Sequence, residues 1–404
     1  MAAVGADPLE LPPVPGFRAS GVATGVKASG PDLALLVADA PAAAAGVLTR
    51  STVVGAPVAL CRERLRRGRA RAVVVNSGVS NVGLGERGLR DARRVTDAVA
   101  RAIGCDAEEV LCASTGVIGE PLPVAKIRAG IPRAVEALRP GGLADAARAI
   151  LTTDTRPKTA ATTTRVDGAA VRVAGIAKGA GMVEPNLATM LAFLLTDAAV
   201  SPACLRRLLR EASDATFNRL TVDGETSTSD TVLLLASGAA GHPRLASGAG
   251  AGGRRLLGAL LEVCEHLVTE LARDGEGASR LVRVRVSGGR NTREADRAAR
   301  RIANSLLVKT AIFGGDPNWG RILQTLGAGR VSFDPVRLEI RLGGVAVYRR
   351  GAAAGPAARA RAARALGSPE VDIEVDLGLG SGEARMWTCD LSYDYIRINA
   401  EYTT

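Results

Sequence analysis

The sequence predicts an α+β protein in which layered sheets pack between helices, and three observations support that prediction. First, continuous apolar runs bounded by turn residues are typical of buried strands, and they occur at 33–37 (LALLV), 71–75 (RAVVV), 191–195 (LAFLL) and 231–236 (TVLLLA). Second, apolar and polar residues alternate at 281–288 (LVRVRVSG) and 371–378 (VDIEVDLG), as in strands with one buried face. Third, helical segments lie between the strands without a clean β–α alternation or a repeat of fixed length.

Local patterns predict the remaining elements in order. Residues 201–213 (SPACLRRLLREAS) predict a helix with Ser201 as its N-cap, and residues 254–272 and 291–307 predict further helices. Residues 337–350 (RLEIRLGGVAVYRR) predict a β-hairpin that turns at Gly343 and Gly344. The terminal IRINAEY (396–402) alternates isoleucine with polar residues and therefore predicts a last strand.

The charge balance favours small anionic substrates over nucleic acid. The chain carries a formal net charge of +11, but arginines and acidic residues are interspersed along the predicted helices, and aromatic residues make up only 3% of the chain. Such a surface lacks the basic stripe and stacking residues of a nucleic-acid binder. The basic residues are nearly all arginine, and the five lysines are therefore candidates for positions that need a compact ammonium: Lys27, Lys126, Lys158, Lys178 and Lys309.

Cysteine and histidine usage limits the possible chemistry. The six cysteines are scattered without a C-x-x-C pair, which indicates a reducing, cytoplasmic location and argues against a zinc site. With only His242 and His266, a Ser-His-Asp arrangement or a histidine-ligated metal is not expected. We also expect no signal peptide and no membrane span, because no apolar run approaches about 20 residues.

Short polar segments interrupt the apolar runs and are the candidates for a functional site. They are NSG (76–78), ASTGVIG (113–119), TTDTRPK (152–158), KGAGM (178–182), NRLTVDGETSTSDT (218–231), DGEGAS (274–279) and FGGDPNWGR (313–321). Each segment on its own is weak evidence for a functional site, since such residues also form ordinary turns. Asp223 with Glu225, and Asp316 with Asn318, are interpreted as loop-forming residues rather than catalytic ones.

Thr189 stands where the glycine-rich segment after Lys178 meets the apolar run at 191–195. A threonine can simply open a strand. In a chain with so little histidine, it can also be a nucleophile whose own α-amine serves as the base, since a free α-amine titrates near ~7.7–8.0. That role requires self-cleavage of the Ala188–Thr189 bond by attack of Thr189 Oγ on the Ala188 carbonyl. Thr115 and Gly116 could then supply the hydroxyl and backbone N–H of an oxyanion hole.

Taken together and in this order, these segments and the terminal INAEYTT resemble the ornithine acetyltransferase family, also called glutamate N-acetyltransferases, from about Gly21 to Thr404. The resemblance implies a layered fold similar to that of N-terminal-nucleophile hydrolases, and self-cleavage into an α chain (1–188) and a β chain (189–404) of one intertwined body. It implies ping-pong acetyl transfer from N-acetylornithine to glutamate through Thr189, releasing ornithine, without a metal or other cofactor. The implied site comprises the oxyanion pair Thr115 and Gly116 and the substrate-contacting residues Thr155, Lys178, Thr189, Glu276, Asn399 and Thr404.

Several alternatives remain open at this point. Acetyl-CoA is a possible second donor, and the resemblance implies αβ units that pair into a dimer or a larger oligomer. Val79 and Ser80 depart from the family pattern after NSG, so the chain could be a specialised paralogue with another donor or acceptor. A second hypothesis is an N-terminal-nucleophile amidohydrolase, in which water and not glutamate cleaves the acyl-enzyme. A non-catalytic binding protein is a third, and the intact Thr189, Thr115, Lys178 and Glu276 argue against it.

Overall fold

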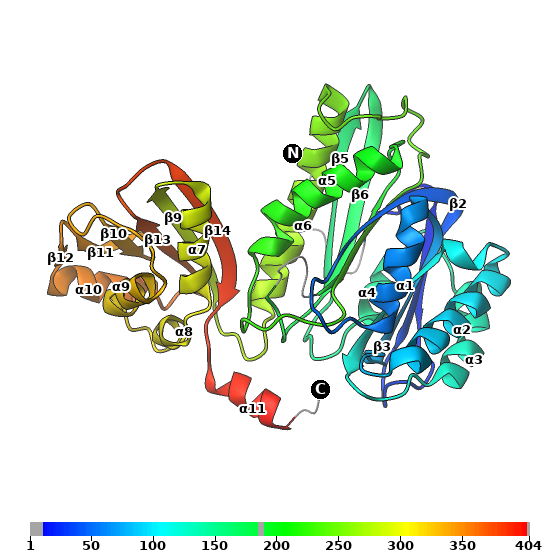
Figure 1. Cartoon of the computed structure of the whole chain (residues 1–404), viewed down its shortest axis with the longest axis horizontal. Coiled ribbons are helices and arrows are strands. Elements are labelled where there is room, and N and C mark those ends of the chain that lie inside the picture. The colour runs from blue at the N-terminus through cyan, green and yellow to red at the C-terminus, as the bar shows by residue number, and fades with distance from the viewer. Residues whose placement is uncertain (1–10, 185–189, 402–404) are drawn as a thin grey trace. The chain divides into compact units, whose positions relative to one another are not determined.

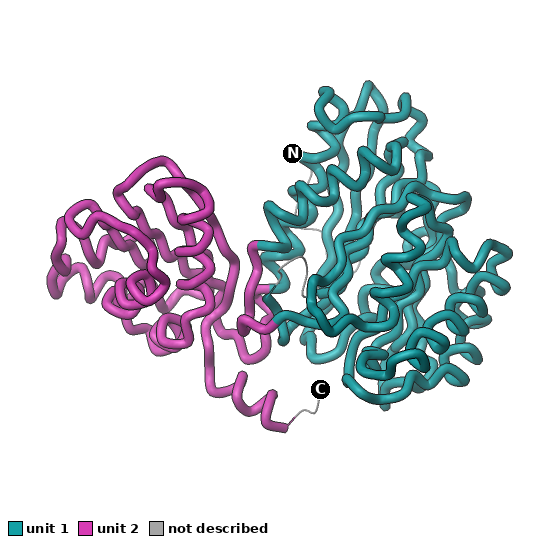
Figure 2. The backbone as a smooth tube through the Cα atoms, viewed as in Figure 1, with its two compact units in different colours: residues 1–218, 226–271, 404 teal, residues 219–225, 272–403 magenta. Residues whose placement is uncertain are grey.

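The computed structural model describes residues 11–184 and 190–401, and these residues form two compact units (Figure 2). Unit 1 takes in the chain up to Asn218 and then Thr226–Leu271. Unit 2 takes in Arg219–Glu225 and the chain from Ala272 onwards. Ala188, Thr189 and Thr404, which the sequence places in the active site, lie outside the described residues.

Unit 1 contains eight strands of one sheet and six α-helices within its described residues (Figure 1). In chain order these are β1 (Phe17–Val22), β2 (Leu33–Leu48), α1 (Ala56–Arg64), β3 (Arg69–Val79), α2 (Gly85–Ile103), β4 (Val110–Val117), α3 (Val124–Glu136), α4 (Leu143–Ala149), β5 (Lys158–Val166), β6 (Ala169–Lys178), β7 (Leu191–Thr196), α5 (Pro202–Ala215), β8 (Thr231–Ala236) and α6 (Ala251–Arg273). The four apolar runs of the sequence lie in β2, β3, β7 and β8, so the predicted strands are confirmed.

The sheet of unit 1 has the strand order β4-β3-β2-β8-β7-β6-β5, and β1 also pairs with β2. The pairs β3/β4 and β7/β8 are parallel, whereas the other neighbours are antiparallel. β2 is long enough to pair with β3 near its start and with β8 near its end. The late strands β7 and β8 therefore stand between β2 and β6, which come earlier in the sequence.

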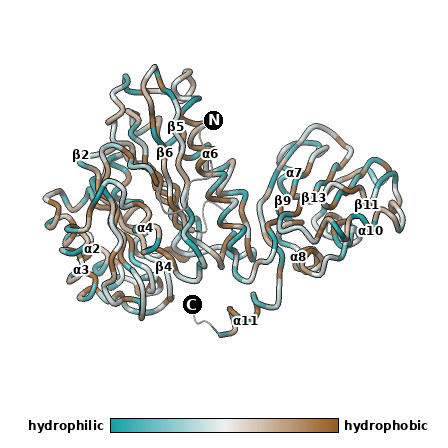
Figure 3. The backbone as a smooth tube through the Cα atoms, turned by 180° about the vertical axis from the view of Figure 1, so that it is seen from behind, coloured by the Kyte–Doolittle hydropathy of each residue, from teal (hydrophilic) through white to brown (hydrophobic). Residues whose placement is uncertain are grey.

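Helices pack on this sheet, and the sheet and its helices form one hydrophobic core. Helix α4 contacts β1, β2, β5 and β6, while α5 contacts β2 and β8. The core cluster joins side chains from both halves of the sheet, such as Val73 in β3, Ile176 in β6 and Phe193 in β7, all of them buried. Figure 3 shows hydrophobic residues concentrated along the strands of this unit. The prediction of an α+β fold with sheet and helix layers is confirmed.

Unit 2 has a six-stranded sheet with the order β12-β11-β10-β13-β9-β14. Its elements are β9 (Leu281–Gly289), α7 (Thr292–Ala303), α8 (Leu306–Phe313), α9 (Trp319–Ala328), β10 (Glu339–Leu342), β11 (Val345–Arg349), β12 (Ala352–Ala353), α10 (Pro356–Ala365), β13 (Glu370–Asp376), β14 (Gly382–Cys389) and α11 (Tyr393–Glu401). On β9 the alternating residues Val282, Val284 and Val286 are all buried in the core of this unit, as the pattern predicts. The hairpin at Gly343 and Gly344 is also confirmed.

Two sequence-based expectations about unit 2 are wrong. The helical run at 291–307 is not one helix, because Ser305 accepts a hydrogen bond from the Val308 amide and begins a new helix, α8, after α7 has ended. The terminal segment IRINAEY is helical in its described part, since α11 extends through Glu401. The Ser392 hydroxyl accepts a hydrogen bond from the Asp394 amide at the start of α11. Ile396 is 64% exposed, so the alternating isoleucines bury no strand face.

Within residues 11–184 and 190–401, no helix combines the length and hydrophobicity that crossing a membrane requires.

Candidate active site

Thr115 and Gly116 lie near the end of β4, paired with the end of β3. In the parallel register, Ser77 stands opposite Thr115, and Gly78 stands opposite Gly116. Gly116 has φ +128°, and a Cβ atom added to it would lie only 2.3 Å from the carbonyl carbon of Gly78. Glycine is therefore required at 116 by both conformation and space.

Hydrogen bonds between β3 and β4 hold this strand end in place. Ser114 Oγ donates to Asn76 Oδ1 (2.6 Å), and Asn76 Nδ2 donates to the Val79 carbonyl (2.8 Å). Ser80, one of the two residues that depart from the family pattern, is buried and donates its hydroxyl to the Val117 carbonyl (2.8 Å). Ser80 thus stabilises the segment that carries Thr115 and Gly116.

Lys178, the last residue of β6, meets Thr115 directly. Its Nζ atom donates to Thr115 Oγ1 (3.3 Å) and to Thr152 Oγ1 (2.6 Å). The side chain is only 8% exposed, and Nζ lies 3.5 Å from Asp154 Oδ2. The structure therefore brings together two of the predicted site residues, Thr115 on β4 and Lys178 on β6, although these strands are not neighbours in the sheet.

Asp154 is the site residue that the sequence reasoning missed. Its carboxylate is fully buried, lies 2.5 Å from Lys158 Nζ and accepts a hydrogen bond from the Gly179 amide (2.7 Å). Burial opposes the charge, but Lys178, Lys158 and the Gly179 amide prevail and hold the pKa of Asp154 well below its usual range. The signal in the sequence that could have pointed to Asp154 is the scarcity of lysine, because two of the five lysines, Lys158 and Lys178, both contact this carboxylate.

A third lysine joins this cluster. Lys27 lies in the turn between β1 and β2, and its Nζ atom donates to the Leu151 carbonyl (2.9 Å). Partial burial is the main cause that lowers the pKa of Lys27; Asp32 and Asp154 oppose it and Lys178 reinforces it. Of the other two lysines, Lys126 is exposed beside the Gly25 carbonyl, and Lys309 is buried in unit 2.

In the sequence, Thr189 lies between the end of β6 and the start of β7, and these two strand ends are paired. Lys178 on β6 stands opposite Leu191 on β7, and the Thr231 amide donates to the Met190 carbonyl (3.0 Å). Thr155, also a predicted site residue, is exposed and follows Asp154 directly.

A second buried aspartate lies just before β8. Asp230 is 1% exposed, and its Oδ2 atom makes no hydrogen bond to any described residue. Burial raises the pKa of Asp230 well above its ordinary value, although the hydroxyls of Ser227 and Thr49 and the charge of Lys178 act in the opposite direction. Burial therefore disfavours the charged form of Asp230, whereas the two lysines favour the charged form of Asp154.

In unit 2 the structure joins two other predicted site residues. Asn399 Nδ2, on α11, donates to Glu276 Oε2 (2.9 Å) and to the Tyr395 carbonyl (3.0 Å). Glu276 is 8% exposed, and Gly277 has φ +68° with a closest approach of 2.3 Å between an added Cβ and the Tyr395 amide nitrogen. The DGEGAS segment is thus packed against α11, which carries Asn399.

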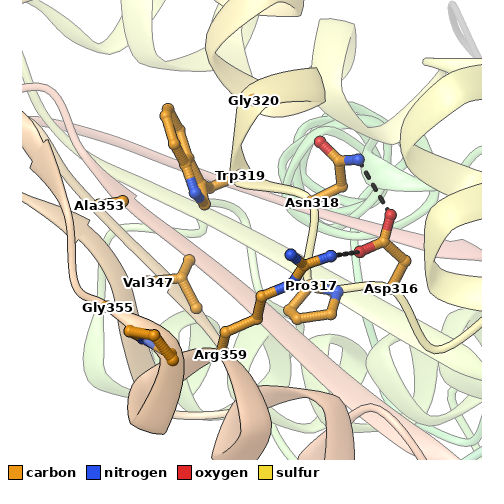
Figure 4. Close-up of a pocket in the computed structure, with 10 residues that line it drawn as sticks. Asp316, Pro317, Asn318, Trp319, Gly320, Val347, Ala353, Gly355 and Arg359 are labelled. Atoms are coloured by element: carbon orange, nitrogen blue, oxygen red, sulfur yellow. Dashed lines mark hydrogen bonds and ion pairs between the residues drawn. The ribbon is translucent and has the colours of Figure 1, made fainter.

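A cavity of about 430 Å³ also lies in unit 2 (Figure 4). Asn318 Oδ1 caps α9 by accepting from the Arg321 amide, and Asn318 Nδ2 donates to Asp316 (2.9 Å), so their predicted loop-forming role is confirmed. None of the predicted site residues lines this cavity. The lining residues are Asp316, Pro317, Asn318, Trp319, Gly320, Val347, Ala353, Gly355, Pro356 and Arg359.

Residues 11–184 and 190–401 contain no group of three or more His, Cys, Asp or Glu side chains that could hold a metal ion.

Comparison with known proteins identifies the family. A family model described as the ArgJ family matches residues 18–404. The Arginine biosynthesis bifunctional protein ArgJ of Symbiobacterium thermophilum is 49% identical over 394 residues, which cover 96% of this chain and 97% of that protein. The protein of the same name from Geobacter sulfurreducens is 49% identical over 392 residues, covering 97% of this chain and 100% of that protein. A crystal structure of ornithine acetyltransferase from Mycobacterium tuberculosis, complexed with ornithine, is 40% identical and covers 45% of this chain and 97% of that one, with a TM-score of 0.40.

The class that these matches define is an acetyltransferase of arginine biosynthesis. The chain belongs to the ArgJ family.

Proposed function

We propose that this enzyme transfers the acetyl group of N-acetylornithine to glutamate through an acetyl-threonine intermediate on Thr189. The observation that carries the proposal is the contact between Lys178 and Thr115 beside the strand that follows Thr189. It joins the predicted oxyanion residue to the predicted substrate-binding lysine.

The hydrogen bonding of Thr115 suits an oxyanion hole. Its Oγ1 atom accepts from Lys178 Nζ (3.3 Å), which leaves the hydroxyl proton available for donation to a developing negative charge. The neighbouring Gly116 can present its amide closely because it carries no side chain. One such donor contributes on the order of 2.7–4 kcal/mol to the transition state of acyl transfer.

The proposed transfer has two balanced halves. Thr189 Oγ attacks the acetyl carbonyl of N-acetylornithine, the C–N bond breaks, and the hydroxyl proton passes through the Thr189 α-amine to the amine of ornithine as it leaves. The amine of glutamate then attacks the acetyl ester, and its proton returns to Thr189 Oγ as N-acetylglutamate forms. Because both substrates are α-amino acids, one site can serve both.

The free α-amine requires cleavage of the Ala188–Thr189 bond, which we propose to be autocatalytic. Thr189 Oγ attacks the Ala188 carbonyl, an N→O shift gives an ester, and water hydrolyses the ester to release a carboxylate at Ala188. The products are the α chain 1–188 and the β chain 189–404.

Further assignments rest on the family resemblance. Thr155, Lys178, Glu276, Asn399 and Thr404 are proposed substrate-binding residues, and Glu276 suits an ammonium group of ornithine. Acetyl-CoA as a second donor, pairing of αβ units into a dimer or larger assembly, and a cytoplasmic location stay predictions, as does the expectation that no cofactor takes part.

The decisive experiment is a denaturing gel with intact mass measurement on the purified protein. We expect two fragments, one of which begins at Thr189, and acetylation of that fragment after incubation with N-acetylornithine. A single 41.5 kDa chain would contradict the proposal. Thr189→Ala should abolish both cleavage and transfer.

Thr115→Ala separates the oxyanion role from folding. We expect it to lower kcat by about 10²–10³-fold, as loss of an oxyanion donor does, with a small change in the urea midpoint of unfolding. Equal losses of stability and activity would instead indicate a structural role for Thr115. If the acetyl-enzyme hydrolyses at a useful rate without glutamate, the protein is an amidohydrolase and the transferase hypothesis is wrong.

A further inference from the structure

Lys27 is held in a fixed position beside the proposed oxyanion hole. The carboxylate of Asp32, which is fully buried, accepts hydrogen bonds from the amides of Thr24 (2.7 Å), Val26 (2.8 Å) and Lys27 (3.1 Å) and from the Thr24 hydroxyl (2.7 Å). Four bonds to one carboxylate fix the backbone of this turn. The backbone position from which the Lys27 side chain extends is therefore fixed.

The stem of Lys27 lies over the glycine pair. A Cβ atom added to Gly78 would lie 3.0 Å from Lys27 Cγ, and Gly78 stands opposite Gly116 in the β3/β4 register. The methylenes of Lys27 thus pack against Gly78, the strand partner of Gly116. A larger residue at 78 would displace them.

Lys27 and Lys178 approach the same short segment with their ammonium groups. Lys27 Nζ donates to the Leu151 carbonyl (2.9 Å), and Lys178 Nζ donates to Thr152 Oγ1, on the next residue (2.6 Å). Asp154 already lies 2.5 Å from Lys158, which is fully buried with it. Within the described chain, the hydrogen bond to the Leu151 carbonyl is the only one that Lys27 Nζ makes, so its remaining protons can meet an anion.

We propose that Lys27 is a substrate-binding residue whose ammonium, together with that of Lys178, holds the α-carboxylate shared by the donor and the acceptor amino acids. The inference rests on the proposed function. In both substrates the carbon of the α-carboxylate is only two bonds from the nitrogen that carries or accepts the acetyl group. When the acetyl carbonyl occupies the oxyanion hole of Thr115 and Gly116, the α-carboxylate must therefore lie close to that hole, where the Lys27 side chain packs.

The shared carboxylate is a better partner than either side chain. Ornithine ends in a cation and glutamate in an anion, so a fixed cation at the side-chain end would repel one of them. A cation at the common α-carboxylate binds both without discrimination. A compact ammonium also suits this crowded position better than a planar guanidinium, in a chain that otherwise prefers arginine.

The test compares Lys27→Met with Lys126→Met in the full, self-cleaved protein. Lys126 donates to the Gly25 carbonyl (2.8 Å) on the same turn, so its replacement removes an equal charge from the neighbourhood. For Lys27→Met we expect KM to rise about tenfold or more for both N-acetylornithine and glutamate, while kcat changes by less than about threefold. Lys126→Met should match the wild type. Unchanged KM values, or a loss confined to kcat, would overturn the proposal.

A second measurement detects the carboxylate directly. The wild type should bind ornithine more tightly than ornithinamide, which lacks the α-carboxylate charge, and Lys27→Met should reduce that ratio by about tenfold. The same ratio in both proteins would refute the contact. Because calorimetric binding needs no turnover, this result stands even if the enzyme proves not to transfer acetyl groups. Lys27→Gln, which retains a donor for the Leu151 carbonyl, serves if the methionine variant does not fold, and it too should lower the ratio.

Discussion

At the scale of single residues, two buried aspartates have pKa values shifted in opposite directions. The charged form of Asp154 is favoured by Lys158 and Lys178, whereas burial outweighs the surrounding donors and raises the pKa of Asp230. The difference comes from the partners, since both side chains are almost completely enclosed. The same substitution at the two positions should therefore change stability by very different amounts.

Asp154→Asn should destabilise the protein by about 3–5 kcal/mol, because removing one partner of a buried ion pair leaves uncompensated charge. Asp230→Asn removes no ion pair and replaces a carboxyl group whose Oδ2 atom has no hydrogen bond to a described residue, so we expect a loss below about 1 kcal/mol. Urea denaturation at neutral pH measures both values. Similar losses at the two positions would show that the lysines do not hold Asp154 charged.

The pH dependence provides a further check on Asp230. Since its pKa is raised in the folded state, its contribution favours folding below its ordinary pKa of about 3.9 and is lost as the pH rises toward the folded value. The wild type should therefore lose stability over that rise relative to Asp230→Asn. Parallel stability curves for the two proteins would contradict the shift.

At the scale of elements, the pair β3/β4 depends on close approach at one glycine. Gly116 and Gly119 both have positive φ, but an added Cβ at Gly119 meets open space, whereas at Gly116 it meets the backbone of Gly78. Gly119→Ala should cost about 1 kcal/mol for its conformation alone. Gly116→Ala should cost several times more and stop acetyl transfer, which denaturation and activity assays on the two variants would test. Equal costs would mean that the strands can separate without penalty.

The elements were predictable where their signal is local. Apolar runs predicted β2, β3, β7 and β8, and Ser201 predicted the start of α5, because strand burial and capping are written in neighbouring residues. The end of the chain misled the prediction: Ile396 and Ile398 have the period of a strand, but neither is buried. The contacts of the site were not local. Asp154 and Lys158 are four residues apart, but Lys178 comes from another segment, and only the folded sheet brings Lys178 to Asp154 and Thr115.

At the scale of the whole molecule, the proposed cleavage divides strands that interlock in unit 1. The order β2-β8-β7-β6 places two strands of the proposed β chain between strands of the α chain, with six residue pairs in each flanking ladder. We expect the fragments 1–188 and 189–404 to elute together in size-exclusion chromatography and to separate only in denaturant. Fragments that separate in native buffer would contradict this arrangement.

The same strand order has a consequence for biosynthesis. During translation, β2 is complete long before β8 has been made, and β8 is the strand that pairs with the C-terminal half of β2. Until Thr231–Ala236 leaves the ribosome, that half of β2 presents unpaired backbone groups, which in a nascent chain invite aggregation. The proposed cleavage must then follow folding, so a plasmid that encodes residues 1–188 and 189–404 as separate polypeptides should yield far less soluble protein than the continuous gene.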